Sequence, residues 1–407
     1  MVSTSTASII GWGEAYATDD DPKAPLELAG EAIRETLDRA GVEKDEVEGF
    51  LTGWAPMADH RPRYNNIMSS HFNLTPSFST TVTFHSAGVI SMFKYAAMAV
   101  TMGIADPVLC VQSDAAASFD DPSGGMAGTD VDPVFEDPYG LVYPSAMALI
   151  ARRQMAEFGV TREQMAEVAV AAREWGMDHP HATFGDAGPL TVQEVLDAPP
   201  VAEPLGLYDC VPWGPAGTGG AFLVTSTENA ASYDFDGPRI DILGTGEYST
   251  HEYVSARPSL RTAAVSAPDQ LTHTGAQESS RRAYEQAGLG PDDVDVAEVT
   301  YLFSNIALLL LEDLGFCEKG HAGEFVENGG IAREGGELPF NTHGGDLTFG
   351  QPGVSLWMNT AVECLRQLSG EPLGASVSDA EIGLVHGMGS TCACHSTVLL
   401  GHEGRAR

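Results

Sequence analysis

An internal repeat is the feature of this 407-residue chain that most restricts its fold. Each copy has apolar residues spaced as on one face of a helix, then a glycine that stops the helix, a short acidic turn and a strand. The shared positions are Ala40, Gly41 and Val47 in the first copy and Ala287, Gly288 and Val294 in the second. Two copies so far apart indicate a duplicated domain, since a solenoid repeats at a much shorter period.

A second pair of segments extends the repeat, because HSAGVISMFKYAAMAV matches QPGVSLWMNTAVECL. In both, a glycine turn opens a long helix, and a loop and an apolar strand follow, VLCV from Val108 and IGLV from Ile382. The matched positions are Gly88, Val89 and Ala96, and Gly353, Val354 and Ala361. Alternating strands and helices predict an α/β fold with two similar, mostly parallel mixed sheets and helices packed in layers. We place the two halves at residues 1–236 and 237–407.

The first half contains an insertion from about residue 116 to 204. It begins with the loop SFDDPSGGMAGTDVDPVFEDPYG and continues as a predicted helix from Ser145 to Phe158. Thr161 and Gln164 form a capping box that opens a second helix to about Trp175. The second half has its own loop, GTGEYSTHEYVSARPSLRTAAVSAPDQ. Long loops on a rigid scaffold usually shape a substrate pocket or a subunit interface.

The composition narrows the possible partners. A net charge of -36 disfavours binding to nucleic acid or to anionic membranes, and the sequence shows neither a signal peptide nor a membrane-spanning stretch, so we expect a cytoplasmic protein. The six cysteines lie without CxxC spacing, which predicts free thiols and no structural metal. Cys392 and Cys394 have the spacing of one strand face and are expected in the core.

Both copies of the repeat place polar residues at a glycine turn before a buried helix. The N-terminus of a helix stabilises a reactive or anionic group, so these turns are the predicted site. The first turn holds His85 and Ser86, and the second spans residues 341–345 and 350–353. A serine beside a histidine suggests a nucleophile, but adjacent side chains at a helix start rarely face each other.

Two of these segments resemble motifs of the thiolase superfamily, and the resemblance covers nearly the whole chain. NTHGGDLTFGQPG is similar to the family's NxxGGxxxxGHPxG signature, and VTFHSAGVISMFKYAAMAV is similar to the segment with the nucleophilic Cys-x-Ser-Gly. Three positions differ in ways that change the chemistry. His85 stands in place of the acyl-accepting cysteine, Gln351 in place of the Gly-His-Pro histidine, and His386 at the strand end of the second cysteine. The fourth motif reads Thr300, Tyr301, Leu302 and Phe303.

The resemblance implies an enzyme that makes or breaks a carbon-carbon bond beside a coenzyme A thioester, with coenzyme A as part of the substrate and no tightly bound cofactor. An imidazole is a poor acyl carrier, which favours the lipid-transfer-protein (sterol carrier protein X) type branch, in which members use a retro-aldol route without a nucleophile. That route needs a base and donors to the thioester oxygen. His85, His386 or Tyr301 is the candidate base and Gln351 a candidate donor. The predicted substrate-binding set is Ser86, His343, Gly344 and Gly345.

Two other readings remain open from the sequence. In one, the chain is a Claisen acyltransferase whose nucleophile lies elsewhere, for example at Cys392. In the other, it is a non-catalytic subunit that binds acyl coenzyme A or scaffolds a complex. Members of this branch work as homodimers and with a small OB-fold and zinc-ribbon protein, so the resemblance implies both kinds of partner. The aldolases of the branch carry His-Gly-Tyr-Gly where this chain has residues 351–354, and their catalytic residues therefore do not transfer.

Overall fold

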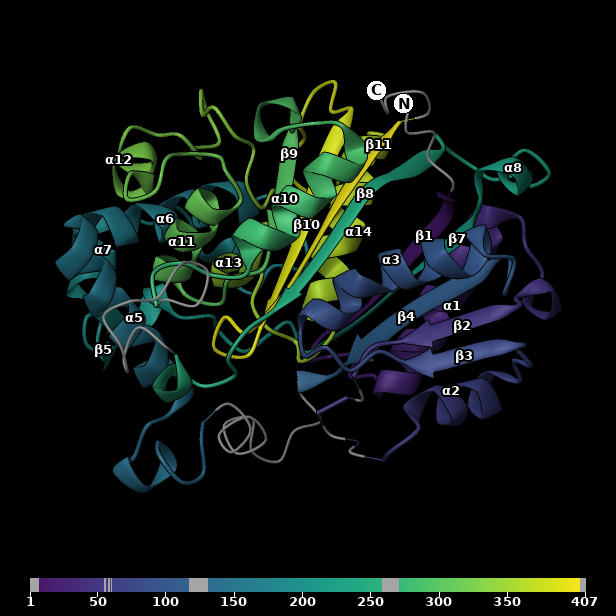
Figure 1. Cartoon of the computed structure of the whole chain (residues 1–407), viewed down its shortest axis with the longest axis horizontal. Helices are drawn as coiled ribbons and strands as arrows, with labels where there is room; N and C mark the ends of the chain where they lie inside the picture. Colours follow the sequence, from purple (N-terminus) through teal and green to yellow (C-terminus); the bar gives the residue numbers. More distant parts are fainter. Residues whose placement is uncertain are drawn as a thin grey trace.

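One mixed β-sheet passes through both halves of the chain and positions the functional turns. The computed structural model describes residues 7–54, 56–57, 59, 61–116, 131–257 and 271–402. The strand order in the sheet is β3-β2-β4-β7-β1-β8-β11-β10-β9. Strands of the first half therefore lie together from β3 to β1, and those of the second half lie together from β8 to β9 (Figure 1).

The positions and pairing of the strands test the predicted, mostly parallel arrangement. Those of the first half are β1 (Ala7–Ala17), β2 (Gly49–Thr52), β3 (Phe78–Thr81), β4 (Val108–Asp114) and β7 (Gly217–Ser226). Those of the second are β8 (Ile240–Ser249), β9 (Val296–Val299), β10 (Ile382–Gly389) and β11 (Cys394–His402). The duplicated α/β fold is confirmed. Within the described strands of this sheet, however, parallel pairing is limited to β3-β2-β4 and β9-β10, because β7 and β11 run antiparallel to both neighbours.

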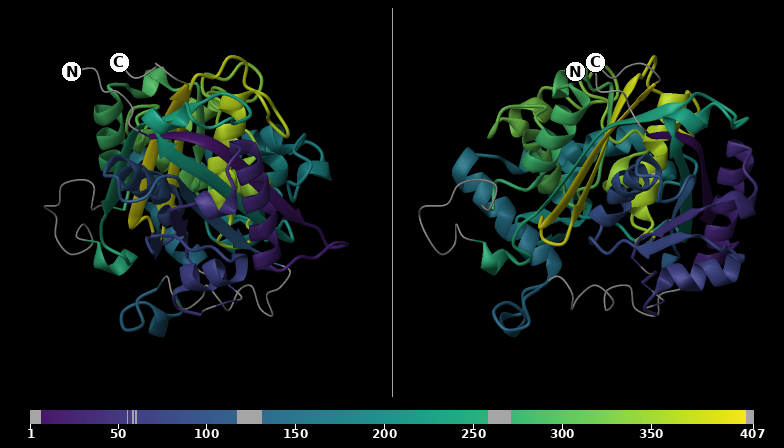
Figure 2. Two further views of the ribbon diagram at one scale, coloured as in Figure 1. Left: turned by 90° about the vertical axis from the view of Figure 1, so that its right-hand side faces the viewer. Right: turned by 45° about the vertical axis from the view of Figure 1, so that its right-hand side comes forward.

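Helices cover and separate the strands in layers (Figure 2). Helix α1 (Pro25–Ala40) packs on the outer face of β1 and β7, and α10 (Ala276–Ala287) packs on β8 and β11. Between the two groups of strands lie α3 (Ala87–Thr101) and α14 (Leu356–Ser369). Helix α3 contacts β4 and β7 of the first half and β10 and β11 of the second. The N-terminal end of α3 is therefore enclosed by residues from both copies of the repeat.

The repeated glycines end helices as the sequence predicts. Gly41 follows α1 with a φ of 62°, and Gly288 follows α10 with a φ of 70°. Both values are in the left-handed region, where a side chain would strain the backbone. Outside the insertion, the other described helices are α2 (Tyr64–Phe72), α8 (Thr227–Ala230), α11 (Ser304–Asp313), α12 (Ala322–Glu327) and α13 (Gly345–Thr348).

The insertion contains the two predicted helices, α5 (Tyr143–Phe158) and α6 (Arg162–Gly176), followed by α7 (Val192–Asp197) and the short strands β5 (Pro200–Ala202) and β6 (Leu205–Gly206). Thr161 and Gln164 form the predicted capping box, with reciprocal hydrogen bonds of 3.1 and 3.2 Å. Most of the loop before α5 and the end of the second-half loop, residues 117–130 and 258–270, lie outside the described residues. The division at residues 236 and 237 falls between β7 and β8 and stays a proposal.

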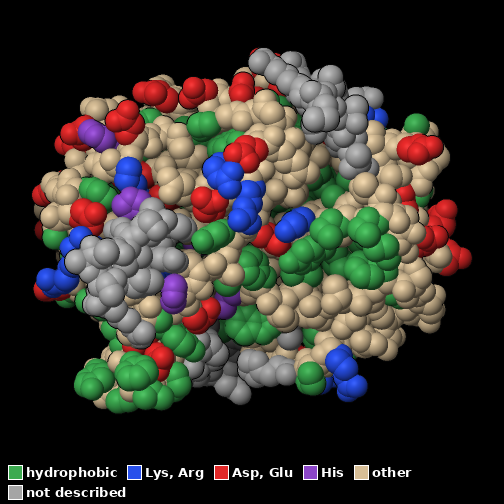
Figure 3. Space-filling view, viewed as in Figure 1, with side chains coloured by type: hydrophobic (Ala, Val, Ile, Leu, Met, Phe, Trp, Pro, Cys, Tyr) green, Lys and Arg blue, Asp and Glu red, His purple; other side chains and the backbone are tan. Residues whose placement is uncertain are grey.

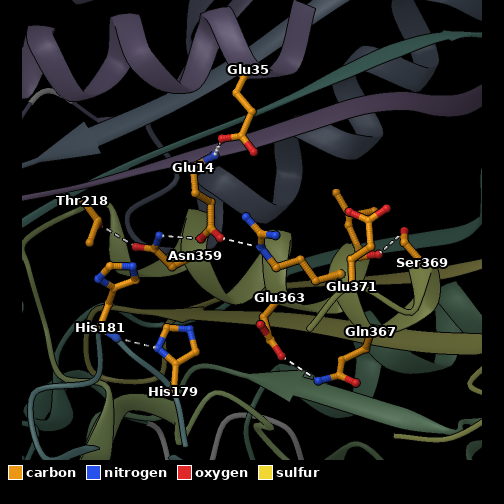
Figure 4. A network of polar contacts seen from close by, with 12 residues as sticks. Glu14, Glu35, His179, His181, Thr218, Asn359, Glu363, Gln367, Ser369 and Glu371 are labelled. Atoms are coloured by element: carbon orange, nitrogen blue, oxygen red, sulfur yellow. Dashed lines mark hydrogen bonds and ion pairs between the residues drawn. The ribbon is translucent and has the colours of Figure 1, made fainter. Parts of the chain in front are cut away.

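A buried polar network fastens β1 of the first half to α14 of the second (Figure 4). The Arg366 Nε donates to Oε2 of Glu14 at 2.8 Å, and the Asn359 amide donates to Oε1 of Glu14 at 2.8 Å. Thr218 on β7 donates to Asn359 at 2.6 Å. The Arg366 and Glu14 side chains are only 9% and 3% exposed. Because both oxygens of the carboxylate are bonded, this ion pair fixes how the two halves meet.

Candidate functional site

His85 occupies a strained position immediately before the central helix α3. Its φ is 46°, in the left-handed region that residues other than glycine rarely adopt. Its side chain is only partly buried, and its ring lies 5.2 Å from that of Trp54, measured between ring centroids. Strain of this kind persists where the surroundings hold a residue in one orientation, and it concentrates at functional sites.

The turn between β10 and β11 sets that orientation. The backbone N–H of Ser390 donates to Nδ1 of His85 at 3.1 Å, and the turn passes close enough that a Cβ on Gly389 would lie 2.8 Å from the His85 Cβ. Ser86 also contacts Nδ1, at 2.8 Å, although neighbours at a helix start were not expected to face each other. Ser86 is only 1% exposed, so its hydroxyl holds the ring and is not presented to a substrate.

These contacts assign the tautomer of His85. A backbone N–H can only donate, so Nδ1 accepts and carries no hydrogen. The proton of the neutral imidazole is therefore on Nε2. In this state His85 is a hydrogen-bond donor, and its basic nitrogen is already engaged.

The supports of the turn come from segments far apart in the sequence. Tyr143 donates its hydroxyl to the Ser390 carbonyl at 3.0 Å, and Arg257 donates to the Cys392 carbonyl at 2.8 Å. Glu252 accepts the Ser390 hydroxyl with its carboxylate. None of these three supports was singled out from the sequence, because no motif marks a residue whose role is to hold a distant turn.

His386 does not join His85. Alternate residues of β10 face opposite sides of the sheet: Gly387 and Gly389 face the start of α3, whereas Leu384 and Met388 belong to the apolar core on the other side. His386 shares the second face and is fully buried. His386 was a candidate base because it ends the strand that carries the superfamily's second cysteine, but the structure places it on the face of β10 that points away from the start of α3.

Instead, His386 and His395 form a buried chain of hydrogen bonds. The Cys392 carbonyl can only accept, so Nε2 of His395, 3.1 Å away, carries a proton. Nδ1 of His395 then accepts from Nε2 of His386 at 3.2 Å, and Nδ1 of His386 accepts from the Thr397 hydroxyl at 2.8 Å. Burial, with the charge of Arg257 nearby, lowers the pKa of His395 to about 3. Both rings are neutral and brace the turn from behind.

Tyr301 lies over the turn that carries the predicted substrate-binding glycines. A Cβ on Gly345 would lie 2.9 Å from the Tyr301 hydroxyl oxygen. The backbone N–H of Tyr301 donates to Asp346 at 2.6 Å, and burial raises the pKa of Asp346 to about 6. Burial also raises the pKa of Tyr301 strongly, so this phenol stays protonated. Tyr301 therefore packs against this turn, in the position of the fourth motif, as a neutral phenol.

Gln351 is buried on the turn before α14, where its backbone pairs with the segment around Trp213. Its N–H donates to Pro212 at 2.8 Å, and its carbonyl accepts from Gly214 at 3.1 Å. The next part of this turn is tied to Asp114, whose Oδ2 accepts from Val354 and from Met57, both at 2.9 Å. Burial raises the pKa of Asp114 to about 6. Asp114, at the end of β4, thus ties the second glycine turn to the segment that follows β2.

His343 is enclosed in a network of acidic residues beneath its turn. Its Nδ1 lies 3.0 Å from Oε2 of Glu298. Burial opposes protonation of the ring, but the hydrogen bond and charge of Glu298 outweigh it, and the pKa of His343 is raised. Thr342 donates to Glu298 at 2.7 Å and lies 2.8 Å from Glu363. Ser86 and His343 were both predicted to bind substrate, but the structure gives each a buried position that braces its turn. Gly344 is the N-cap of α13, and Gly345 is the first residue of that helix.

The carboxyl of Glu363 predicts a pH-dependent effect on stability. Burial, with Glu298 nearby, raises its pKa above the ordinary value, so the native state holds a proton that the unfolded state releases above about pH 4.3. This contribution to stability is lost as the pH rises through the raised pKa. Glu363→Gln has no such loss, so the variant should gain stability relative to the wild type between pH 5 and pH 8, measured by urea unfolding. A constant difference across this range would contradict the assignment.

Cys392 is poorly suited to act as a replacement nucleophile. It lies in the turn between β10 and β11 with a φ of 58°, not on a strand face with Cys394, and is 2% exposed. Burial raises the pKa of the Cys392 thiol to about 12. We predict that iodoacetamide at pH 8 leaves Cys392 unmodified in the folded protein, as read by peptide mass spectrometry. The unfolded protein, in which Cys392 should be labelled, provides the control. Rapid labelling of Cys392 in the folded protein would support the hypothesis of an acyltransferase that uses this cysteine as its nucleophile.

Sequence comparisons give one matching family and several similar proteins. Residues 258–402 match the family described as "Thiolase C-terminal domain-like". An acetyl-CoA acetyltransferase of Methanothermobacter thermautotrophicus is 32% identical over 374 residues, which cover 91% of this chain and 93% of that protein. A steroid side-chain-cleaving aldolase of Thermomonospora curvata is 32% identical over 361 residues, covering 85% and 86%. A 17-hydroxy-3-oxo-4-pregnene-20-carboxyl-CoA lyase of Mycobacterium tuberculosis is 31% identical over 381 residues, covering 89% and 92%.

A solved structure extends the likeness to the whole described fold. The structure named "Ltp2-ChsH2(DUF35) aldolase" superposes with a TM-score of 0.81 and 28% identity, covering 99% of this chain and 100% of that one. Within the described residues, no helix has the length and apolar character needed to cross a membrane. In the same part of the chain, no three His, Cys, Asp or Glu side chains gather as metal ligands would.

Proposed function

Because the chain belongs to the thiolase superfamily, we propose that it cleaves the bond between C2 and C3 of a 3-hydroxyacyl coenzyme A thioester by a retro-aldol reaction. The observation that carries this proposal is the fixed tautomer of His85 at the start of α3, where the superfamily places its nucleophilic cysteine. An Nε2–H donor at a helix N-terminus suits an enolate oxygen and cannot form an acyl-enzyme through the same nitrogen. The relatives named aldolase and lyase support the same reaction type.

The reaction requires a base, an electron sink and a proton donor. A base removes the proton of the 3-hydroxyl, and the C2–C3 bond breaks to give a carbonyl compound. The electron pair of the broken C2–C3 bond moves into the thioester and forms an enolate. His85 stabilises the enolate oxygen by donating a hydrogen bond from Nε2. The enolate then takes up a proton at C2 and leaves as a shorter acyl coenzyme A. No bound cofactor is needed, since the thioester itself accepts the electrons.

The direct test is incubation of the purified protein with a panel of 3-hydroxyacyl coenzyme A thioesters. Release of a shorter acyl coenzyme A together with an aldehyde or ketone, followed by liquid chromatography and mass spectrometry, is the expected result. Incubation with 3-ketoacyl coenzyme A and free coenzyme A tests the rival acyltransferase. Thiolysis or a stable acyl adduct on the protein would contradict the proposal, and binding of acyl coenzyme A without turnover would favour the non-catalytic subunit.

The active assembly, we further propose, contains a second copy of the chain and a small partner with an OB-fold and a zinc ribbon. The name of the similar aldolase structure joins two components, which supports a two-component assembly. Apolar side chains are exposed on the loop before α5, with Val134 and Phe135 each 65% and Tyr139 85% exposed, and apolar groups appear on the lower edge of the molecule (Figure 3). Light scattering of the chain alone, and after co-expression with such a partner, tests both parts.

A further inference from the structure

The retro-aldol reaction proposed above needs a base, and His85 is excluded from that role. Its Nδ1 accepts from Ser390 and its Nε2 carries the proton. The other predicted bases do not fit either. His386 is buried on the far face of β10, and Tyr301 is a buried phenol whose pKa is raised. A different side chain must take the proton of the 3-hydroxyl.

Two buried aspartates near the glycine turns, Asp114 and Asp346, already accept backbone N–H groups. Asp114 accepts three backbone N–H groups, from Met57, Val354 and Ala115. Asp346 accepts from the backbone of Tyr301 and Leu302 and is fully buried. Asp114 holds its loops through both oxygens, and Asp346 holds its loop through Oδ2, while Oδ1 of Asp346 is buried. Neither is presented to a substrate.

We infer that Glu252 is the base. Ser390 connects it directly to His85, because the Ser390 hydroxyl donates to the Glu252 carboxylate while its backbone N–H donates to His85. The Thr391 hydroxyl donates to the backbone carbonyl of Glu252. The segment that carries Glu252 is therefore attached to the turn at two points, one through the carboxylate and one through the main chain. Glu252 as a residue is partly exposed.

The same turn thus presents a donor and an acceptor side by side. The Ser390 N–H fixes His85 with its proton on Nε2, and the Ser390 hydroxyl donates to the carboxylate of Glu252. Glu252 takes the hydroxyl proton as the C2–C3 bond breaks and the electron pair moves to the thioester oxygen near His85. The carboxylic acid so formed returns its proton to C2 of the enolate, which restores the carboxylate and closes the cycle.

The test rests on the proposed function and uses a 3-hydroxyacyl coenzyme A that the wild type cleaves. Glu252→Gln keeps an oxygen for the Ser390 hydroxyl but loses the basic oxygen, so kcat should fall by about 10²- to 10⁴-fold while KM changes little. Glu252→Ala should be inactive and should recover part of its rate in added formate, which can enter the space and act as the base. Glu318→Ala, at an exposed glutamate, is the matched control and should keep the wild-type rate.

The outcomes separate the two proposals. If the wild type cleaves no 3-hydroxyacyl coenzyme A, the proposed function fails. If the wild type is active and Glu252→Gln keeps its kcat within about fivefold, only the assignment of Glu252 fails. Two results together would also overturn the assignment of Glu252 as the base: loss of acyl coenzyme A affinity in Glu252→Gln, measured by calorimetry, and no rescue of Glu252→Ala by formate. Glu252 would then only position the turn. Thermal unfolding of each variant verifies that it is folded.

Discussion

His85→Ala should lower kcat for a cleaved 3-hydroxyacyl coenzyme A by about 10²- to 10³-fold, the loss typical of removing one donor to an oxyanion. The reason is the fixed tautomer: Ser390 directs the ring so that Nε2 carries the hydrogen. KM should change much less, since the charge on the thioester oxygen develops mainly in the transition state. Steady-state kinetics with the wild type and the variant measure both quantities.

A conservative variant distinguishes donation from packing. His85→Gln keeps an N–H donor of similar reach and should recover part of the lost rate, whereas His85→Leu fills similar space without a donor and should not. His85→Cys restores the thiol of the superfamily, but the retro-aldol reaction gains nothing from it and should stay slow. Equal rates for His85→Gln and His85→Leu would refute the role of His85 as a donor.

Arg366→Met should destabilise the protein by about 3 to 5 kcal/mol. The substitution leaves the carboxylate of Glu14, which is only 3% exposed, without its ionic partner at 2.8 Å. An uncompensated buried charge is far more costly than the loss of an exposed ion pair. Urea unfolding at neutral pH gives the difference in the free energy of unfolding.

Two variants control this measurement. The double substitution Glu14→Gln with Arg366→Met removes both charges and should recover much of the lost stability. Arg153→Met breaks an ion pair whose arginine is 55% exposed, and should cost about 1 kcal/mol or less. A similar loss for Arg366→Met and Arg153→Met would mean that the network in Figure 4 does not hold the halves together.

The fold was largely predictable because its signals are local. Gly41 and Gly288 end helices through their own backbone freedom, and Thr161 caps the next helix with its own side chain. The sequence also located β10, but a strand alternates its side chains between two faces, and the sequence does not say which face meets α3. Only the folded chain shows that His386 lies on the face of β10 away from His85.

The contacts that give the site its chemistry were beyond the reach of local patterns. Ser390 and His85 are separated by 305 positions, and the hydrogen bond between them decides which nitrogen of the ring is protonated. Glu252 enters only through Ser390, and it lies in a loop that carries no recognised motif. Residue types and spacing indicate a reactive turn, but a tautomer depends on neighbours that only the folded chain brings together.

The central helix layer divides the site between the two copies of the repeat. The first half provides His85, and the second half provides Ser390, Glu252 and Arg257, which orient it. In the proposed mechanism, neither copy alone supplies both His85 and Glu252. If the chain were cut between β7 and β8, each fragment should be inactive, and turnover should return only when the fragments reassociate with β1 against α14. The rate of the enzyme would then serve as a measure of how accurately the duplicated units dock.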